Sequence, residues 1–142
     1  MNKRFLISVV ALLVTSMVLG FVVHGMLLGA DYARLVPSGI FRSQEDSQQY
    51  FVWMLLAHVL IAIGFTWVYR AGRDSRPWLG QGVRFGLAIA VLATIPGYLI
   101  YFAVQPLPMS LVVKQIAFDT VAMVILGIVA AAVNRDPLAA RA

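Results

Sequence analysis

The acidic side chain of Asp119 lies well inside a long apolar segment, between Phe118 and a run that begins with Thr120 and Val121. An ionised carboxylate at the centre of a membrane span costs roughly 2.5–3.5 kcal/mol on insertion scales. A polar partner on another segment is therefore expected. The chain has two histidines, and an imidazole beside a carboxylate lets the pair share one proton and respond to pH.

The depth of each polar residue follows from a rise of 1.5 Å per helical residue, if each span is straight and centred in the bilayer. On that basis His58 and Asp119 both fall within about 5 Å of the midplane, whereas His24 lies about 10–12 Å out. We therefore expect a contact between Asp119 and His58. The route outward is expected to be lined by His24, Gln115, Tyr98 and Tyr101.

Three interpretations of this set stay open: a structural network of interhelical hydrogen bonds, a proton-coupled or ligand-binding pocket, and a metal or haem site. A divalent metal would use His24, His58 and Asp119, and haem would need both imidazoles on opposite sides of its ring. No close histidine pair strengthens either alternative, so no cofactor is expected. The chain lacks cysteine and the HExxH, GxSxG, Walker and dinucleotide-binding patterns, which argues against an enzyme.

The composition is that of an integral membrane protein. Hydrophobic residues make up 61% of the 142 positions and charged residues only 12%, against roughly 25% charged in soluble domains. The net charge of +5 does not indicate nucleic-acid binding, because the basic residues flank apolar segments. We expect one transmembrane domain over residues 1–142, with the lipid bilayer as its surroundings.

Long apolar segments, each sufficient for a helix across about 30 Å of hydrocarbon, predict an all-α four-helix bundle. The first is interpreted as a retained span, because it is longer than a signal-peptide core and lacks a clear cleavage site. An outer loop, Asp31–Gln49, and a cytoplasmic loop, Ala71–Gly80, separate the spans. The expected spans are Phe5–Leu28, Phe51–Tyr69, Val83–Val104 and Met109–Val133.

The distribution of Lys and Arg predicts that both termini are cytoplasmic. With the N-terminus inside, the cytoplasmic side holds eight of the eleven basic residues, and only Arg34, Arg42 and Lys114 fall outside. We expect a multi-pass protein of a bacterial inner membrane.

Small residues recur at helical spacing in the third span and predict close helix packing at Gly82, Gly86, Ala90 and Gly97. The short Gln105–Pro108 turn makes the third and fourth spans antiparallel neighbours, so Gly127, Ala130 and Ala131 are expected to face this stripe. A homo-oligomer seam on the same face is the alternative. Pro96 is expected to bend the third span and free a carbonyl near Leu92.

Three motifs resemble a group of small uncharacterised bacterial four-span inner-membrane proteins: His24-Gly25-x-Leu27-Leu28-Gly29-x-x-Tyr32, Phe65-x-Trp67-x-Tyr69 and Gly82-x-Arg84-Phe85-Gly86. The resemblance covers nearly the whole chain and implies an inner-membrane location without catalytic residues. Small multidrug resistance transporters also have four spans, but they carry an essential carboxylate in the first span, where this chain has none.

The sequence favours a non-enzymatic binding or assembly component with a polar pocket in its outer half. Its partner would be another membrane protein or a second copy of the chain. A proton-coupled small-molecule transporter that uses Asp119 is the first alternative, and a haem- or metal-binding redox subunit is the second. A transporter would require Asp119 to change protonation while it faces each side in turn.

Overall fold

The structure is a computed structural model that describes residues 3–135, and within that range every regular element is helical. Four of the helical stretches are long and apolar enough to cross a membrane, which indicates a multi-pass membrane protein. These stretches are Lys3–Leu27, Phe51–Gly72, Trp78–Val104 and Met109–Asn134. The all-α fold class with four potential spans is confirmed.

The first and third spans are each interrupted by a π-helical segment. The first consists of α1 (Lys3–Gly20) and η1 (Phe21–Leu27), and the third of α5 (Trp78–Ile89), η3 (Ala90–Thr94) and α6 (Ile95–Val104). π-Helical turns are rare and are often found at functional sites. The irregular η3 turn lies just before Pro96, where the sequence predicted a disturbed hydrogen-bond ladder.

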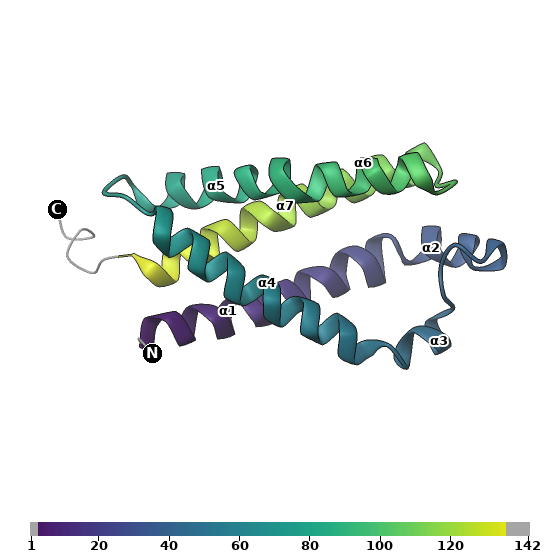
Figure 1. Ribbon diagram of the computed structural model, residues 1–142, viewed down its shortest axis with the longest axis horizontal. Coiled ribbons are helices and arrows are strands. Elements are labelled where there is room, and N and C mark those ends of the chain that lie inside the picture. Colours follow the sequence, from purple (N-terminus) through teal and green to yellow (C-terminus); the bar gives the residue numbers. More distant parts are fainter. Residues whose placement is uncertain (1–2, 136–142) are drawn as a thin grey trace.

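The second and fourth spans are continuous helices, α4 (Phe51–Gly72) and α7 (Met109–Asn134). Three short helices fill the predicted outer loop: α2 (Gly29–Leu35), η2 (Val36–Ser38) and α3 (Gln44–Gln48). Figure 1 shows α5, α6 and α7 as an antiparallel hairpin, while α1 lies against α4. The start of α1 and the end of α7 lie at the same end of the bundle (Figure 1).

The third span begins earlier than the sequence predicted, at Trp78 instead of Val83. The side chain of Gln81 explains this, because it binds the preceding connection from within the first turn of α5. Its amide donates to the carbonyl oxygens of Asp74 and Arg76, and its Oε1 accepts from the Asp74 N–H at 3.1 Å. The last residues of the predicted loop, Trp78 to Gly80, are therefore the start of the helix.

Glycine allows α5 and α7 to touch backbone to backbone. A Cβ on Gly82 would lie 2.7 Å from the carbonyl oxygen of Gly127, and a Cβ on Gly86 would lie 2.6 Å from the Cα of Val124. Ala90 is fully buried on the same side of the helix. The predicted packing role of Gly82, Gly86 and Ala90 is confirmed.

Gly97 does not belong to this packing stripe, so its predicted role was wrong. Apart from its chain neighbours and the adjacent backbone of its own helix, no atom lies within 4 Å of the position that its Cβ would occupy. The physical reason is the π-helical segment η3, which lies between Ala90 and Gly97 and changes the number of residues per turn. Spacing that is regular in the sequence therefore does not continue along one face of the helix.

A buried polar cluster joins three spans at the end where α1 begins. This inner polar cluster comprises Ser8, Thr66 and Asn134, all nearly inaccessible. The amide of Asn134 donates to Ser8 Oγ at 2.9 Å and to the carbonyl oxygen of Ala130 at 2.8 Å. Arg70 donates to Asn134 Oδ1 at 3.4 Å. Buried polar groups with partners link α1, α4 and α7 where lipid offers none.

Candidate functional site

Asp119 lies on α7 and is largely enclosed, with 12% of its side chain exposed. The hydroxyl of Tyr98, from α6, donates to Asp119 Oδ2. His24, from η1, places its Nε2 3.4 Å from Asp119 Oδ1. Each carboxylate oxygen therefore has a polar neighbour from a different span, which offsets the cost of burial.

His24 bridges the last span and the outer segment. Its Nδ1 lies 2.7 Å from the hydroxyl of Tyr32 on α2, and that hydroxyl also accepts a hydrogen bond from Gln115 Nε2 at 3.2 Å. The outer polar cluster thus consists of His24, Tyr32, Tyr98, Gln115 and Asp119. It includes residues of η1, α2, α6 and α7. At the imidazole of His24, the outer helix α2 and the fourth span both contact the first span.

Local structure explains why these side chains meet. The π-helical segment η1 carries His24, and the helix hydrogen bond from the Leu28 N–H to the Val23 carbonyl closes it at 2.9 Å. Leu28 and Val23 are buried against Leu111, which brings α2 over the start of α7. Gln115 and Asp119 are four residues apart on α7 and share a face, as the sequence predicted.

The donors and acceptors define one consistent arrangement for a neutral imidazole. Gln115 donates to the Tyr32 oxygen, and the single hydroxyl hydrogen of Tyr32 is then available for Nδ1 of His24. His24 therefore carries its hydrogen on Nε2, which points at Asp119. Burial raises the pKa of Tyr32, and the nearby carboxylates of Asp119 and Asp31 raise that pKa further. The hydroxyl therefore stays a donor at neutral pH.

One acceptor at the cluster has no partner among the described residues. Gln115 Oε1 is buried without a hydrogen bond, and solvent cannot supply one because the residue is only 5% exposed. An unsatisfied buried polar atom costs about 1–3 kcal/mol. The cluster therefore has a place for one more hydrogen-bond donor.

The expected contact between Asp119 and His58 was wrong. His58 Nδ1 instead lies 3.0 Å from Ser16 Oγ, and its ring packs on Gly20, where an added Cβ would be 3.2 Å from Cε1. The depth calculation treated every span as straight and centred, so it placed Asp119 level with His58. The contacts show that Asp119 is level with His24.

Some of the remaining predicted site residues belong to the outer polar cluster and one does not. Tyr98 and Gln115 belong to the outer polar cluster, whereas Tyr101 is 56% exposed and lies outside it. Sequence reasoning did not assign Tyr32 to the site, although a phenol eight residues after His24 was part of a quoted motif. It also did not predict the partner of Lys114, which is Asp31, at 2.8 Å.

The three residues suggested for a metal are not gathered. In the part of the chain that the structure describes, no group of three His, Cys, Asp or Glu side chains is close enough to hold a metal ion. Both ring nitrogens of His24 already face Tyr32 and Asp119, and Nδ1 of His58 faces Ser16. This geometry does not fit bis-histidine haem or a His24–His58–Asp119 metal site.

Comparison with known families adds one result. Residues 7–131 match the family described as "Protein of unknown function (DUF1761)". The chain belongs to this family. The match includes the outer polar cluster in full, while Asn134 of the inner polar cluster lies beyond it. Comparisons with curated proteins and with solved structures each found no match.

Proposed function

We propose that this DUF1761 protein is a non-enzymatic binding or assembly component of a bacterial inner membrane, and that its outer polar cluster binds a proton. The observation that carries the proposal is the position of His24, with Nδ1 at 2.7 Å from the Tyr32 hydroxyl and Nε2 at 3.4 Å from Asp119. Imidazole is the side chain whose charge ordinarily changes between about pH 5 and pH 8. One proton taken up there would alter contacts of both α2 and α7.

The consequence of proton uptake follows from the hydrogen-bond inventory. A protonated imidazole donates through both nitrogens, so Nδ1 would donate to the Tyr32 oxygen and no longer accept from it. The Tyr32 hydrogen would then be free to reach Gln115 Oε1, the acceptor that has no partner, after the amide turns over. His24 and Asp119 would also become an ion pair. Protonation thus reverses the direction of the hydrogen bond between Tyr32 and Gln115 and adds an ion pair, which strengthens the link from α7 through His24 to α2.

Titratable groups from several elements surround His24. Asp119 faces His24 from the fourth span, and Tyr98 of the third span binds Asp119. Tyr32 faces His24 from α2. His58, on α4, lies against Ser16 and Gly20 of α1. The Lys114–Asp31 ion pair also joins α7 to α2.

The test uses the absence of native cysteine, which makes paired labelling simple. Spin labels at Ala33→Cys on α2 and Val113→Cys on α7, both exposed positions, report the separation of these helices in nanodiscs. We expect a narrower distance distribution at about pH 5 than at about pH 8. His24→Gln should abolish the difference, whereas His58→Gln should keep it. Identical distributions at both pH values in the parent protein would contradict the proposal.

The location and orientation are part of the proposal. The basic residues Arg70 and Arg73 bind Asn134 at the end of the bundle where α1 begins. The positive-inside rule makes that end cytoplasmic. The outer polar cluster then lies in the outer half of the membrane, and both termini lie inside.

A proton-coupled carrier is the second candidate, because Asp119 is an intramembrane carboxylate and π-helical segments interrupt two of the spans that supply its neighbours. Such segments are frequent at functional sites. Liposomes with the protein and an interior pH dye would then show proton flux that Asp119→Asn removes. Flux that persists in Asp119→Asn, or none in the parent protein, would contradict this candidate.

A further inference from the structure

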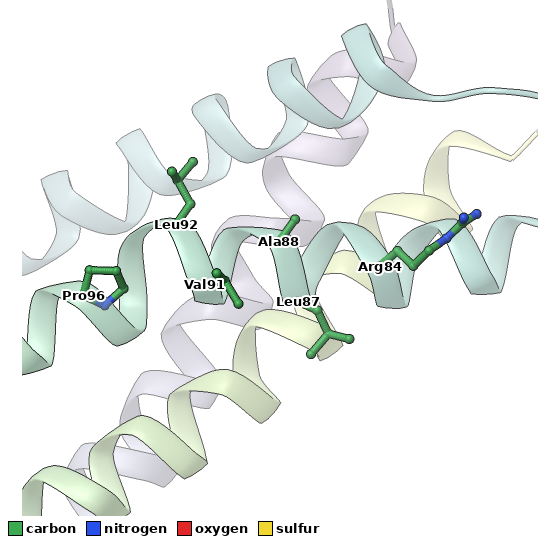
Figure 2. A pocket seen from close by; sticks show the side chains of 6 residues that line it. All are labelled: Arg84, Leu87, Ala88, Val91, Leu92 and Pro96. Atoms are coloured by element: carbon green, nitrogen blue, oxygen red, sulfur yellow. The ribbon is translucent and has the colours of Figure 1, made fainter.

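A shallow groove of about 800 Å³ runs along the third span, on a different surface from the outer polar cluster. Figure 2 shows the side chains that line it, with Ala88 between Leu92 and Arg84. The groove is lined by Arg84, Leu87, Ala88, Val91, Leu92 and Pro96. We call this feature the third-span groove.

The groove arises from side-chain size on one helix surface. Arg84, Ala88 and Leu92 follow one another at four-residue spacing, which places them in one row along the helix. The methyl group of Ala88 is the lowest point of that row, with longer side chains before and after it (Figure 2). Leu87 and Val91 form the neighbouring row, so the depression has an apolar wall along its length.

The groove opens away from the bundle. Gly82, Gly86 and Ala90 turn the buried side of the third span towards α7, whereas Leu92 is 77% exposed and Val91 is 66% exposed. In a membrane, this surface meets acyl chains. Twelve residues separate Arg84 from Pro96, which is about 18 Å of helix, close to the roughly 15 Å depth of one hydrocarbon leaflet.

A cation lies at one end of the groove. The Arg84 side chain extends along the helix away from Pro96 (Figure 2), and its Nε donates to the carbonyl oxygen of Gly80 at 3.4 Å. No carboxylate among residues 3–135 lies within ion-pair distance of Arg84. Guanidinium groups that reach towards a membrane surface in this way are suited to bind phosphate.

We propose that the third-span groove binds one acyl chain of an anionic membrane phospholipid, with Arg84 holding the lipid phosphate. The apolar depression matches the chain in length and polarity, and the cation at its end matches the charge of the headgroup. This site is independent of proton binding at His24, because it shares no residue with the outer polar cluster.

The first experiment measures lipid retained by the detergent-purified protein after addition of equal amounts of phosphatidylglycerol and phosphatidylcholine, by native mass spectrometry. The parent protein should retain the anionic lipid about fivefold more than the zwitterionic one, the factor that one cationic side chain contributes near an anionic surface. Arg84→Gln should bring this ratio close to one. Arg34→Gln, on exposed α2, is the matched control and should leave the ratio unchanged.

The second experiment separates the apolar part of the site from the charge. Ala88→Leu raises the lowest point of the groove and should reduce retention of both lipids, while circular dichroism confirms that the exposed substitution leaves the helices folded. A photo-crosslinking residue in place of Val91 should capture lipid. Unchanged selectivity in Arg84→Gln, unchanged retention in Ala88→Leu, or capture of a second copy or another protein at Val91 would overturn the proposal.

Discussion

Gly86→Ala should lower the free energy of unfolding in mild detergent by about 3 kcal/mol, the upper part of the usual range for overpacking. The added methyl group would lie 2.6 Å from the Cα of Val124 and even closer to the carbonyl oxygen of Met123. Both are backbone atoms, so no side chain can rotate away. The two helices must separate, and their contacts along the stripe weaken together.

The matched control for this substitution lies in the same span. Gly97→Ala adds the same methyl group where nothing lies within 4 Å, and alanine is a better helix former than glycine by about 1 kcal/mol. It should leave stability unchanged or raise it slightly. Titration with a denaturing detergent, followed by circular dichroism, measures both. Equal stability of the two variants would show that the α5–α7 backbone contact is looser than the structure indicates.

Asn134→Leu should lower the free energy of unfolding by about 2–3 kcal/mol. The substitution keeps the branched heavy-atom skeleton but removes the amide that donates to Ser8 Oγ and the oxygen that accepts from Arg70. Ser8 is fully buried, and Thr66, also fully buried, is its remaining polar neighbour at 3.4 Å. The buried hydroxyl of Ser8 would therefore lose a donor where solvent cannot replace it, and the half-buried Arg70 would lose an acceptor.

A double-mutant cycle tests whether this cost comes from the hydrogen bond. Ser8→Ala alone and Asn134→Leu alone should each destabilise the protein, and the double variant should cost less than the sum by about 1 kcal/mol. Ser38→Ala removes an exposed hydroxyl that bonds only locally and serves as the control. Strict additivity of the two buried substitutions would indicate that the hydrogen bond between Asn134 and Ser8 does not stabilise the bundle.

Hydropathy was sufficient to predict the four potential spans, because a stretch of about 20 apolar residues has few other structural solutions. The glycine stripe was also predictable as far as Ala90, since small residues at four-residue spacing leave a helix surface almost without side chains. The antiparallel pairing of the last two spans followed from the short Gln105–Pro108 connection. These features depend on local sequence and simple geometry.

The partner of Asp119 depends on how helices tilt and where their periodicity changes, so it could not be predicted in the same way. The π-helical segment η1 carries His24, and α2 folds back to place Tyr32 beside it. Neither event has a strong sequence signal. Asn134 was missed for a different reason: it lies just beyond the predicted end of the fourth span at Val133, although α7 continues through it and buries its side chain.

The polar connections are distributed unequally around α4. Thr66, Arg70 and His58 tie it to its neighbours, whereas the outer polar cluster includes no residue of α4. Towards Phe51 the helix carries strongly exposed side chains, among them Val52 and Trp53. These attachments hold α4 between His58 and Arg70 and leave its first residues without a polar tie to the other spans. Thermal displacement of α4 should therefore be largest at its Phe51 end (Figure 1).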